Sequence, residues 1–94
     1  MPAIGLLTLE LHLHAAQSLK DKRQVVRSLK DRIRRRFNVS VAEVDHQSSY
    51  RLCTVAVVAV ASNKSGVEAI LTAVEEAASE ILGGNLADSS IELI

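Results

Sequence analysis

The segment YRLCTVAVVAVAS, residues 50–62, restricts the fold more than any other feature of this chain. From Val55 to Ala61 the side chains are apolar at every position, so both faces of an extended segment would be apolar. Such a strand belongs in the interior of a sheet, where neighbouring elements cover it. The run is also far shorter than the roughly 20 residues that a membrane-spanning helix needs. We therefore expect a central β-strand and no membrane association.

A second strand is predicted by the alternation in IGLLTLELHLH, residues 4–14. One face carries Leu7, Leu9, Leu11 and Leu13, and the opposite face carries Thr8, Glu10, His12 and His14. This period of two is typical of a strand with one buried face. Two shorter segments, NVSVAEVD at residues 38–45 and SSIELI at residues 89–94, favour two further strands.

Two amphipathic helices are predicted between these strands. In residues 18–37, Ser18 followed by Asp21 is typical of a capping box, and an apolar stripe lies opposite the basic side chains. Lys22 is an exception on the apolar side, where its aliphatic stem could lie along the edge of the core. In the second helix, Ser65 with Glu68 again indicates a capping box, and Gly83-Gly84 indicates the end. Its expected stripe is Val67, Ile70, Leu71, Val74, Ala78 and Ile81.

The order β-α-β-β-α-β predicts one α+β domain over residues 1–94 with a ferredoxin-like fold. Right-handed crossovers place both helices on one face of a four-stranded antiparallel sheet. Either Val55, Val57 and Ala59 or Ala56, Val58 and Val60 must then line the open face. Large exposed apolar patches usually mark interfaces, so we expect a homodimer or higher homo-oligomer through this face. The alternative is a monomer with a modest exposed patch.

The net charge of zero conceals a strongly polarised chain. Nine of the eleven Lys and Arg residues lie in SLKDKRQVVRSLKDRIRRRF, residues 18–37, against two Asp, so this segment carries about +7 and the rest about −7. A basic helix face of this kind can contact nucleic-acid phosphates without reading bases. The candidate RNA- or anion-binding residues are Lys20, Arg23, Arg27, Lys30, Arg34 and Arg35.

The basic face could also serve the fold itself, in either of two ways. The cluster Arg32, Arg34, Arg35 and Arg36 could complement the negative end of the helix dipole. Some cations could instead pair with Glu68, Glu75, Glu76 and Glu80 of the neighbouring helix, although four carboxylates cannot neutralise nine cations. Base stacking on the sheet is not expected, because Tyr50 is the one aromatic residue near the third strand.

Several segments resemble the YlxP-like family of small uncharacterised bacterial domains. These are LTLELHL, SLKDKRQVVRSLKDRIRRRFNVSVAEVDHQ and TVAVVAVASN, which together cover residues 4–63 closely, with a looser match over the last helix. The matching motif residues are Ser18, Leu19, Lys20, Lys22, Arg23, Arg36, Phe37, Asn38 and Glu43. Asp21 stands where the family more often has Glu. The resemblance implies a ferredoxin-like fold and a gene near those for an initiation factor and a ribosome-binding factor. It implies no established activity, so no catalytic residues carry over.

We therefore expect a cytoplasmic, non-enzymatic module that docks on RNA or a ribosomal particle and needs no cofactor. The alternative is an oligomeric regulatory module that binds a small ligand or a metal. His12, His14 and Glu10 share one strand face, and His46 could join them, but two converging ligands make no metal site. The single Cys53 suits a reducing compartment and is expected to act as a small buried apolar residue. No basic segment precedes the first apolar run, so we expect no signal peptide.

Overall fold

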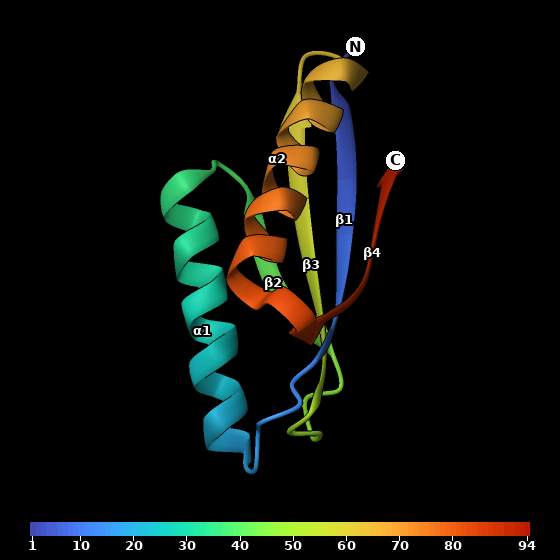
Figure 1. Cartoon of the computed structure of the whole chain (residues 1–94). Helices are drawn as coiled ribbons and strands as arrows, with labels where there is room; N and C mark the ends of the chain where they lie inside the picture. The colour runs from blue at the N-terminus through green and yellow to red at the C-terminus, as the bar shows by residue number, and fades with distance from the viewer.

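The computed structural model describes all residues, 1–94, and its elements follow the expected order. They are β1 (Ala3–His12), α1 (Leu19–Arg36), β2 (Ser40–Asp45), β3 (Leu52–Ala61), α2 (Lys64–Leu82), the short 3-10 turn η1 (Gly83–Asn85) and β4 (Leu86–Leu93). The four strands form one sheet in the order β2-β3-β1-β4, and each neighbouring pair is antiparallel. Both helices lie on the same side of the sheet (Figure 1). The predicted ferredoxin-like fold is confirmed, although β4 begins at Leu86 instead of residue 89.

The core fills the space between the sheet and the two helices. The alternation in the sequence of the first strand correctly predicted which of its residues enter the core: Leu7, Leu9, Leu11 and Leu13 are all buried. From β3 the buried set is Cys53, Val55, Val57 and Ala59, and the helices add Val26, Leu29, Ile33, Val67, Leu71, Val74 and Ala78. Burying each large aliphatic side chain contributes about 1.5–3 kcal/mol, so an almost wholly aliphatic core can hold a domain of this size.

Gly5 of β1 lets α2 approach the sheet closely. A Cβ atom at this position would lie 2.8 Å from Leu71 Cδ1 and closer still to Val67 Cγ1. Real Cβ atoms do not pack at such distances, so the residue without a side chain is what this helix–strand contact requires. The close approach seats α2 over β1, while α1 lies to the side of α2 over the β2 edge (Figure 1).

The capping residue predicted for α1 is confirmed, and the one predicted for α2 is not. Ser18 caps α1, since its hydroxyl accepts a hydrogen bond from the backbone N of Asp21 at 3.1 Å, and Asp21 Oδ2 accepts from Gln17 N. The predicted cap at Ser65 is wrong. Asn63 caps α2 through a bond from Gly66 N to its Oδ1 at 2.8 Å, and the Ser65 hydroxyl donates to the same oxygen. An amide oxygen two residues earlier thus takes the role.

The open face of the sheet is divided into an apolar half and a polar half. Ala56, Val58 and Val60 of β3 lie on this face, and the register pairs Ile4 with Val60 and Leu6 with Val58. Val60 is 64% exposed, the most of any large hydrophobic residue within β3.

At the polar half of this face, Glu10 Oε2 accepts a hydrogen bond from Thr54 Oγ1 at 2.9 Å, and Glu10 is paired with Asp88 of β4. This half carries the carboxylates of Glu10 and Asp88, and the register places exposed Glu92 beside Leu6, so the face is unfavourable for phosphate at both ends. The homo-oligomer expected through this face stays a prediction. Neither helix combines the length and the apolar character that crossing a membrane would require.

Candidate nucleic-acid interface

Most of the cations of α1 point away from the core. Val26, Leu29 and Ile33 bury one side of the helix, and the periodicity of about 3.6 residues per turn directs the basic positions outward. Of the six candidate residues, Lys20, Arg23, Arg27, Arg34 and Arg35 are exposed and Lys30 is partly buried. The structure thus presents the six along one side of α1, with the exposed carboxylate of Asp31 among them.

These outward cations have no carboxylate partner in the structure. The single ion pair of the whole chain joins Lys22 to Glu43 in the interior, with Nζ and Oε2 2.8 Å apart. None of the glutamates of α2 pairs with an arginine of α1, and Glu75 instead accepts a hydrogen bond from Ser89 Oγ at 2.7 Å. The pairing considered between the two helices is therefore absent, and the positive charge of α1 remains available to an external anion.

Arg34 differs from the remaining candidates because its guanidinium is partly used within the fold. Its Nη2 donates a hydrogen bond to the carbonyl oxygen of Val41, 2.7 Å away. This contact ties the last turn of α1 to β2. Arg34 consequently combines a fold-stabilising contact with surface charge, whereas Arg23, Arg27 and Arg35 make no hydrogen bond through their side chains.

Lys22 was expected to lay its stem along the edge of the core, and the structure buries its ammonium group as well. The whole residue is 2% exposed, and its ammonium is surrounded by acceptors. Nζ donates to the carbonyl oxygens of His46 and Ser49, each at 2.6 Å, besides its ion pair with Glu43. Three acceptors match the three protons of an ammonium group, which explains how a charge can be buried here. Lys22 is thus not available for binding RNA.

The thiol of Cys53, the carboxylate of Glu43 and the ammonium group of Lys22 form one cluster of polar contacts. Cys53 Sγ donates to Glu43 Oε2 at 3.4 Å, and the same oxygen meets Lys22. Burial would raise the pKa of Glu43, but hydrogen bonds from Lys22 and Cys53 and the charge of Lys22 lower it below its ordinary 4.5. Burial, followed by the charge of Glu43, raises the pKa of Cys53 to about 12.

Such a trio can support covalent catalysis only when the thiolate forms and substrate reaches it. Cys53 is 1% exposed, and none of the four surface hollows is lined by Lys22, Glu43 or Cys53. A thiol held protonated in a closed interior is a poor nucleophile. The cluster therefore serves to join α1, β2 and β3.

The three histidines do not gather with further ligands. The rings of His12 and His14 lie with their centroids 4.2 Å apart and their planes tilted by 35°, and the backbone N of His14 donates to Asn85 Oδ1. Glu10 is engaged by Thr54, and no group of three His, Cys, Asp or Glu side chains is placed to hold a metal ion. The arrangement gives no support to the metal-binding alternative.

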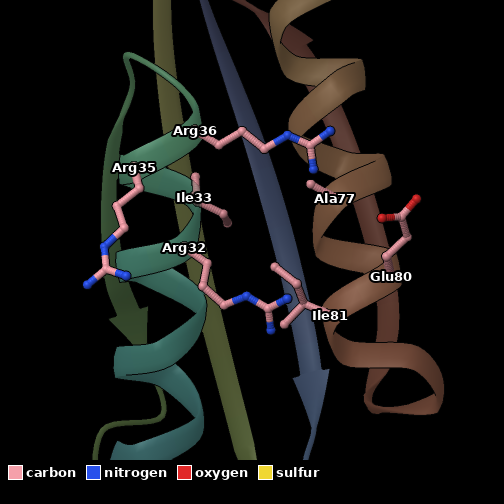
Figure 2. A pocket seen from close by; sticks show the side chains of 7 residues that line it. All are labelled: Arg32, Ile33, Arg35, Arg36, Ala77, Glu80 and Ile81. Carbon is pink, nitrogen blue, oxygen red and sulfur yellow. The ribbon is translucent and has the colours of Figure 1, made fainter.

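Beyond the six candidate residues, the structure shows a groove between the two helices. Its volume is about 330 Å³ and its lining is Arg32, Ile33, Arg35, Arg36, Ala77, Glu80 and Ile81. Figure 2 shows Arg32 and Arg36 extending from α1 across the groove toward α2, while Arg35 points away. The sequence places Arg32 and Arg36 in the basic segment, but their position over the groove depends on how far apart the helices lie.

A family model described as "Protein of unknown function (DUF503)" matches residues 4–91. The chain belongs to the DUF503 family. One relative is "Uncharacterized protein YlxP" of Bacillus subtilis (strain 168), which is 32% identical over 65 residues covering 69% of this chain and 71% of the relative. The resemblance found in the sequence is thereby confirmed. The function of the DUF503 family is unknown, so the site must be interpreted from its own chemistry.

Two solved structures of designed proteins resemble this DUF503 chain in fold. One is "De novo designed protein Foldit4", with a TM-score of 0.56 and 12% identity, covering 100% of this chain and 94% of the designed chain. The second is the de novo designed protein LFR1 1 with ferredoxin fold, with the same TM-score and identity, covering 100% and 84%. At this level of identity the likeness concerns the fold alone, and it agrees with the ferredoxin-like topology.

Proposed function

We propose that this protein is a cytoplasmic, non-enzymatic module that docks on RNA, such as the RNA of a ribosomal particle, through the outward cations of α1. The observation that carries the proposal is the lack of any intramolecular carboxylate partner for these cations. Unpaired arginines along one helix attract a polyanion and release its counterions when they bind. Lys20, Arg23, Arg27, Arg34 and Arg35 are exposed on this surface and Lys30 is partly buried, and Arg34 also contacts β2.

The distribution of charge on the rest of the molecule supports the same orientation. The open sheet face carries Glu10 and Asp88, and α2 carries four glutamates, so both surfaces repel phosphate. A polarised molecule of this kind approaches RNA with α1 first. The sheet also lacks an aromatic platform for base stacking, and phosphate contact through α1 is the remaining mode.

The test is sedimentation of cell lysate through a sucrose gradient at low and at moderate salt. The wild type is compared with Arg23→Glu/Arg27→Glu/Arg35→Glu, a variant chosen because these side chains make no hydrogen bond in the fold. We expect the wild type to travel with ribosomal particles at low salt and to leave them as salt rises, and the variant to stay at the top. Each lost phosphate contact lowers the salt slope by about 0.7–0.9.

A second variant tests whether negative charge added away from α1 also releases the protein from the particles. In Ala69→Glu/Thr72→Glu the added carboxylates lie on the exposed surface of α2, far from the basic surface in sequence. This variant should travel with the particles as the wild type does. If folded wild-type protein stays at the top at low salt, RNA docking is wrong. A melting temperature raised by a small ligand, and unaffected by the α1 changes, would then favour the regulatory module.

A further inference from the structure

We propose that the groove between α1 and α2 holds one unpaired nucleotide of an RNA strand. This inference rests on the proposed function and adds to it a defined binding site. The groove has an arginine wall, Arg32 and Arg36, on the α1 side and an apolar floor. Glu80 of α2 lies at the opposite rim with its carboxylate turned away from the arginines in Figure 2, so this exposed side chain must rotate to reach a base. A nucleotide has three matching parts: an anionic phosphate, the flat apolar faces of its base and a hydrogen-bonding base edge.

The arginine wall is suited to a phosphate. Arg32 and Arg36 lie one helical turn apart, about 6 Å along the axis at 1.5 Å per residue. Both guanidinium groups extend over the groove, and neither has a carboxylate or hydrogen-bond partner in the structure. Arg36 also lies near the ring of Phe37, with Cζ 5.4 Å from the ring centroid, which helps to orient it. A planar guanidinium can bind a phosphate with two hydrogen bonds or stack on a base.

The floor and the far rim are suited to a base. Ile33 is wholly buried beneath the groove and Ala77 nearly so, and the apolar surface that a base could contact comes mainly from Ile81, which is partly buried. Glu80 is exposed on the rim of α2, and its ionised carboxylate is purely a hydrogen-bond acceptor. A carboxylate binds base edges that carry N–H donors. Guanine offers two adjacent donors on its Watson–Crick edge and uracil offers one, so we expect guanine to be preferred over uracil.

Glu80 also argues against an acidic peptide as the occupant. An amphipathic acidic segment could contact the arginines and the apolar floor, but its carboxylates would approach Glu80 at the rim, which is unfavourable. A base combines an apolar face with donors toward Glu80 and places its charge on the phosphate alone. The chemistry of the lining thus fits a nucleotide better than a peptide.

The groove continues onto the basic surface of α1, which points to a strand instead of a free nucleotide. A second hollow on α1 is lined by Gln24, Arg27, Ser28, Asp31, Arg32 and Arg35. It shares Arg32 and Arg35 with the groove, so the two are contiguous. Phosphates of the flanking nucleotides can contact Arg27 and Arg35 here, although the carboxylate of Asp31 in the same hollow opposes them. The base of a duplex cannot reach the floor without leaving its stack.

The test is fluorescence anisotropy with labelled eight-nucleotide RNAs: one containing a guanine among uridines, one of uridines alone, and one duplex. In Arg32→Gln/Arg36→Gln we expect affinity for the guanine-containing strand to fall about tenfold or more, while duplex affinity falls only slightly. The control Arg23→Gln/Arg27→Gln removes the same charge outside the groove and should weaken strand and duplex alike. A loss in the groove variant no larger than in this control would overturn the inference.

Base reading is tested separately with Glu80→Gln and the control Glu68→Gln, which removes the same charge from α2 away from the groove. Glu80→Gln should reduce the preference for guanine by about fivefold or more, and Glu68→Gln should leave it unchanged. An unaltered preference in Glu80→Gln would refute the site. Guanosine monophosphate competing as well as the strand, or an alternating Leu-Glu peptide displacing the RNA, would refute the strand as occupant. If the wild type binds no RNA at low salt, the proposed function itself fails.

Discussion

Lys22 Nζ lies 2.8 Å from Glu43 Oε2, in an interior position that joins α1 to β2. The same ammonium donates to the carbonyl oxygens of His46 and Ser49, so one side chain also holds the turn between β2 and β3. His46 adopts a φ of 64° in that turn, an uncommon conformation for a residue with a side chain. A buried charge with all its protons bonded thus fixes a segment that apolar packing does not reach.

Removing Lys22 should destabilise the fold severely. Lys22→Ala leaves two carbonyl oxygens and Glu43 without their donor, and breaking a buried pair costs about 3–5 kcal/mol. Urea unfolding followed by circular dichroism measures the loss. Lys20→Ala, on the exposed side of the same helix, should change stability by about 0.5 kcal/mol or less. Equal effects of the two substitutions would show that the buried pair has no special importance.

The stability should fall on acidification because of Glu43. The pKa of this carboxyl is lowered in the folded state, so its contribution is present above the unfolded value of about 4.5 and is lost as pH falls through the folded value. Urea midpoints between about pH 7 and pH 3 measure the decline. In Glu43→Gln the decline should be shallower, whereas the control Glu68→Gln should keep the wild-type slope. An unchanged slope in Glu43→Gln would contradict the assignment.

Cys53 should stay unreactive in the folded protein and should lower stability at alkaline pH. Its pKa is raised from 9.0 to about 12, so the folded state keeps the proton while the unfolded state loses it, and stability declines between these values. Reaction with a thiol reagent at about pH 8 should therefore follow unfolding, with denaturant accelerating it sharply. In Cys53→Ala the part of the alkaline decline due to the thiol should vanish. Rapid labelling under native conditions would contradict the closed interior.

The apolar half of the open sheet face should form a homodimer interface. Sedimentation equilibrium should give a dimer for the wild type and a monomer for Val58→Glu, because a carboxylate there would be buried against apolar side chains of the partner. Thr72→Glu, an exposed substitution on α2, should leave the dimer intact. In such a dimer both α1 helices lie on the outer surfaces, so the dimer carries two basic helices. A wild type that stays monomeric at high concentration would exclude this arrangement.

Gly5 should tolerate no side chain. Gly5→Ala places a Cβ against Val67 and Leu71, and overpacking of this kind costs about 1–3 kcal/mol. The melting temperature should fall by several degrees, since about 1 kcal/mol corresponds to about 4–8 °C in a domain of this size. Gly84→Ala, where a Cβ meets nothing within 4 Å, is the matched control and should leave the melting temperature almost unchanged. A similar shift in both variants would argue against a steric cause.

The order of elements was accessible from the sequence because each signal was local. The alternation in β1 and the stripe of α1 each depend on residues within one element. All four leucines predicted for β1 are buried, and Val26, Leu29 and Ile33 of the α1 stripe are buried, while Leu19, Val25 and Phe37 are only partly buried. The start of α2 was missed because Asn63 and Ser65 are both good capping residues, and the backbone geometry decides between them.

The remaining features depend on residues that are distant in the sequence. The helical periodicity placed Lys22 on the apolar side of its helix, but it could not identify Glu43 as its partner, because Glu43 lies far away in the sequence. The groove of Arg32 and Arg36 depends on the separation of the two helices, which follows from their packing on the sheet. The lack of ion pairs between the arginines of α1 and the glutamates of α2 likewise depends on the relative position of the two helices in the fold.

The pairing of β1 has a consequence for how the chain folds. This first strand lies between β3 and β4, so its two neighbours come from the middle and from the far end of the domain. During synthesis, β1 therefore keeps one unpaired edge until residues 86–93 have emerged. Closing so long a loop late slows folding relative to a helical bundle of equal size. Until then the nascent chain exposes an unpaired strand edge, which can pair with another chain.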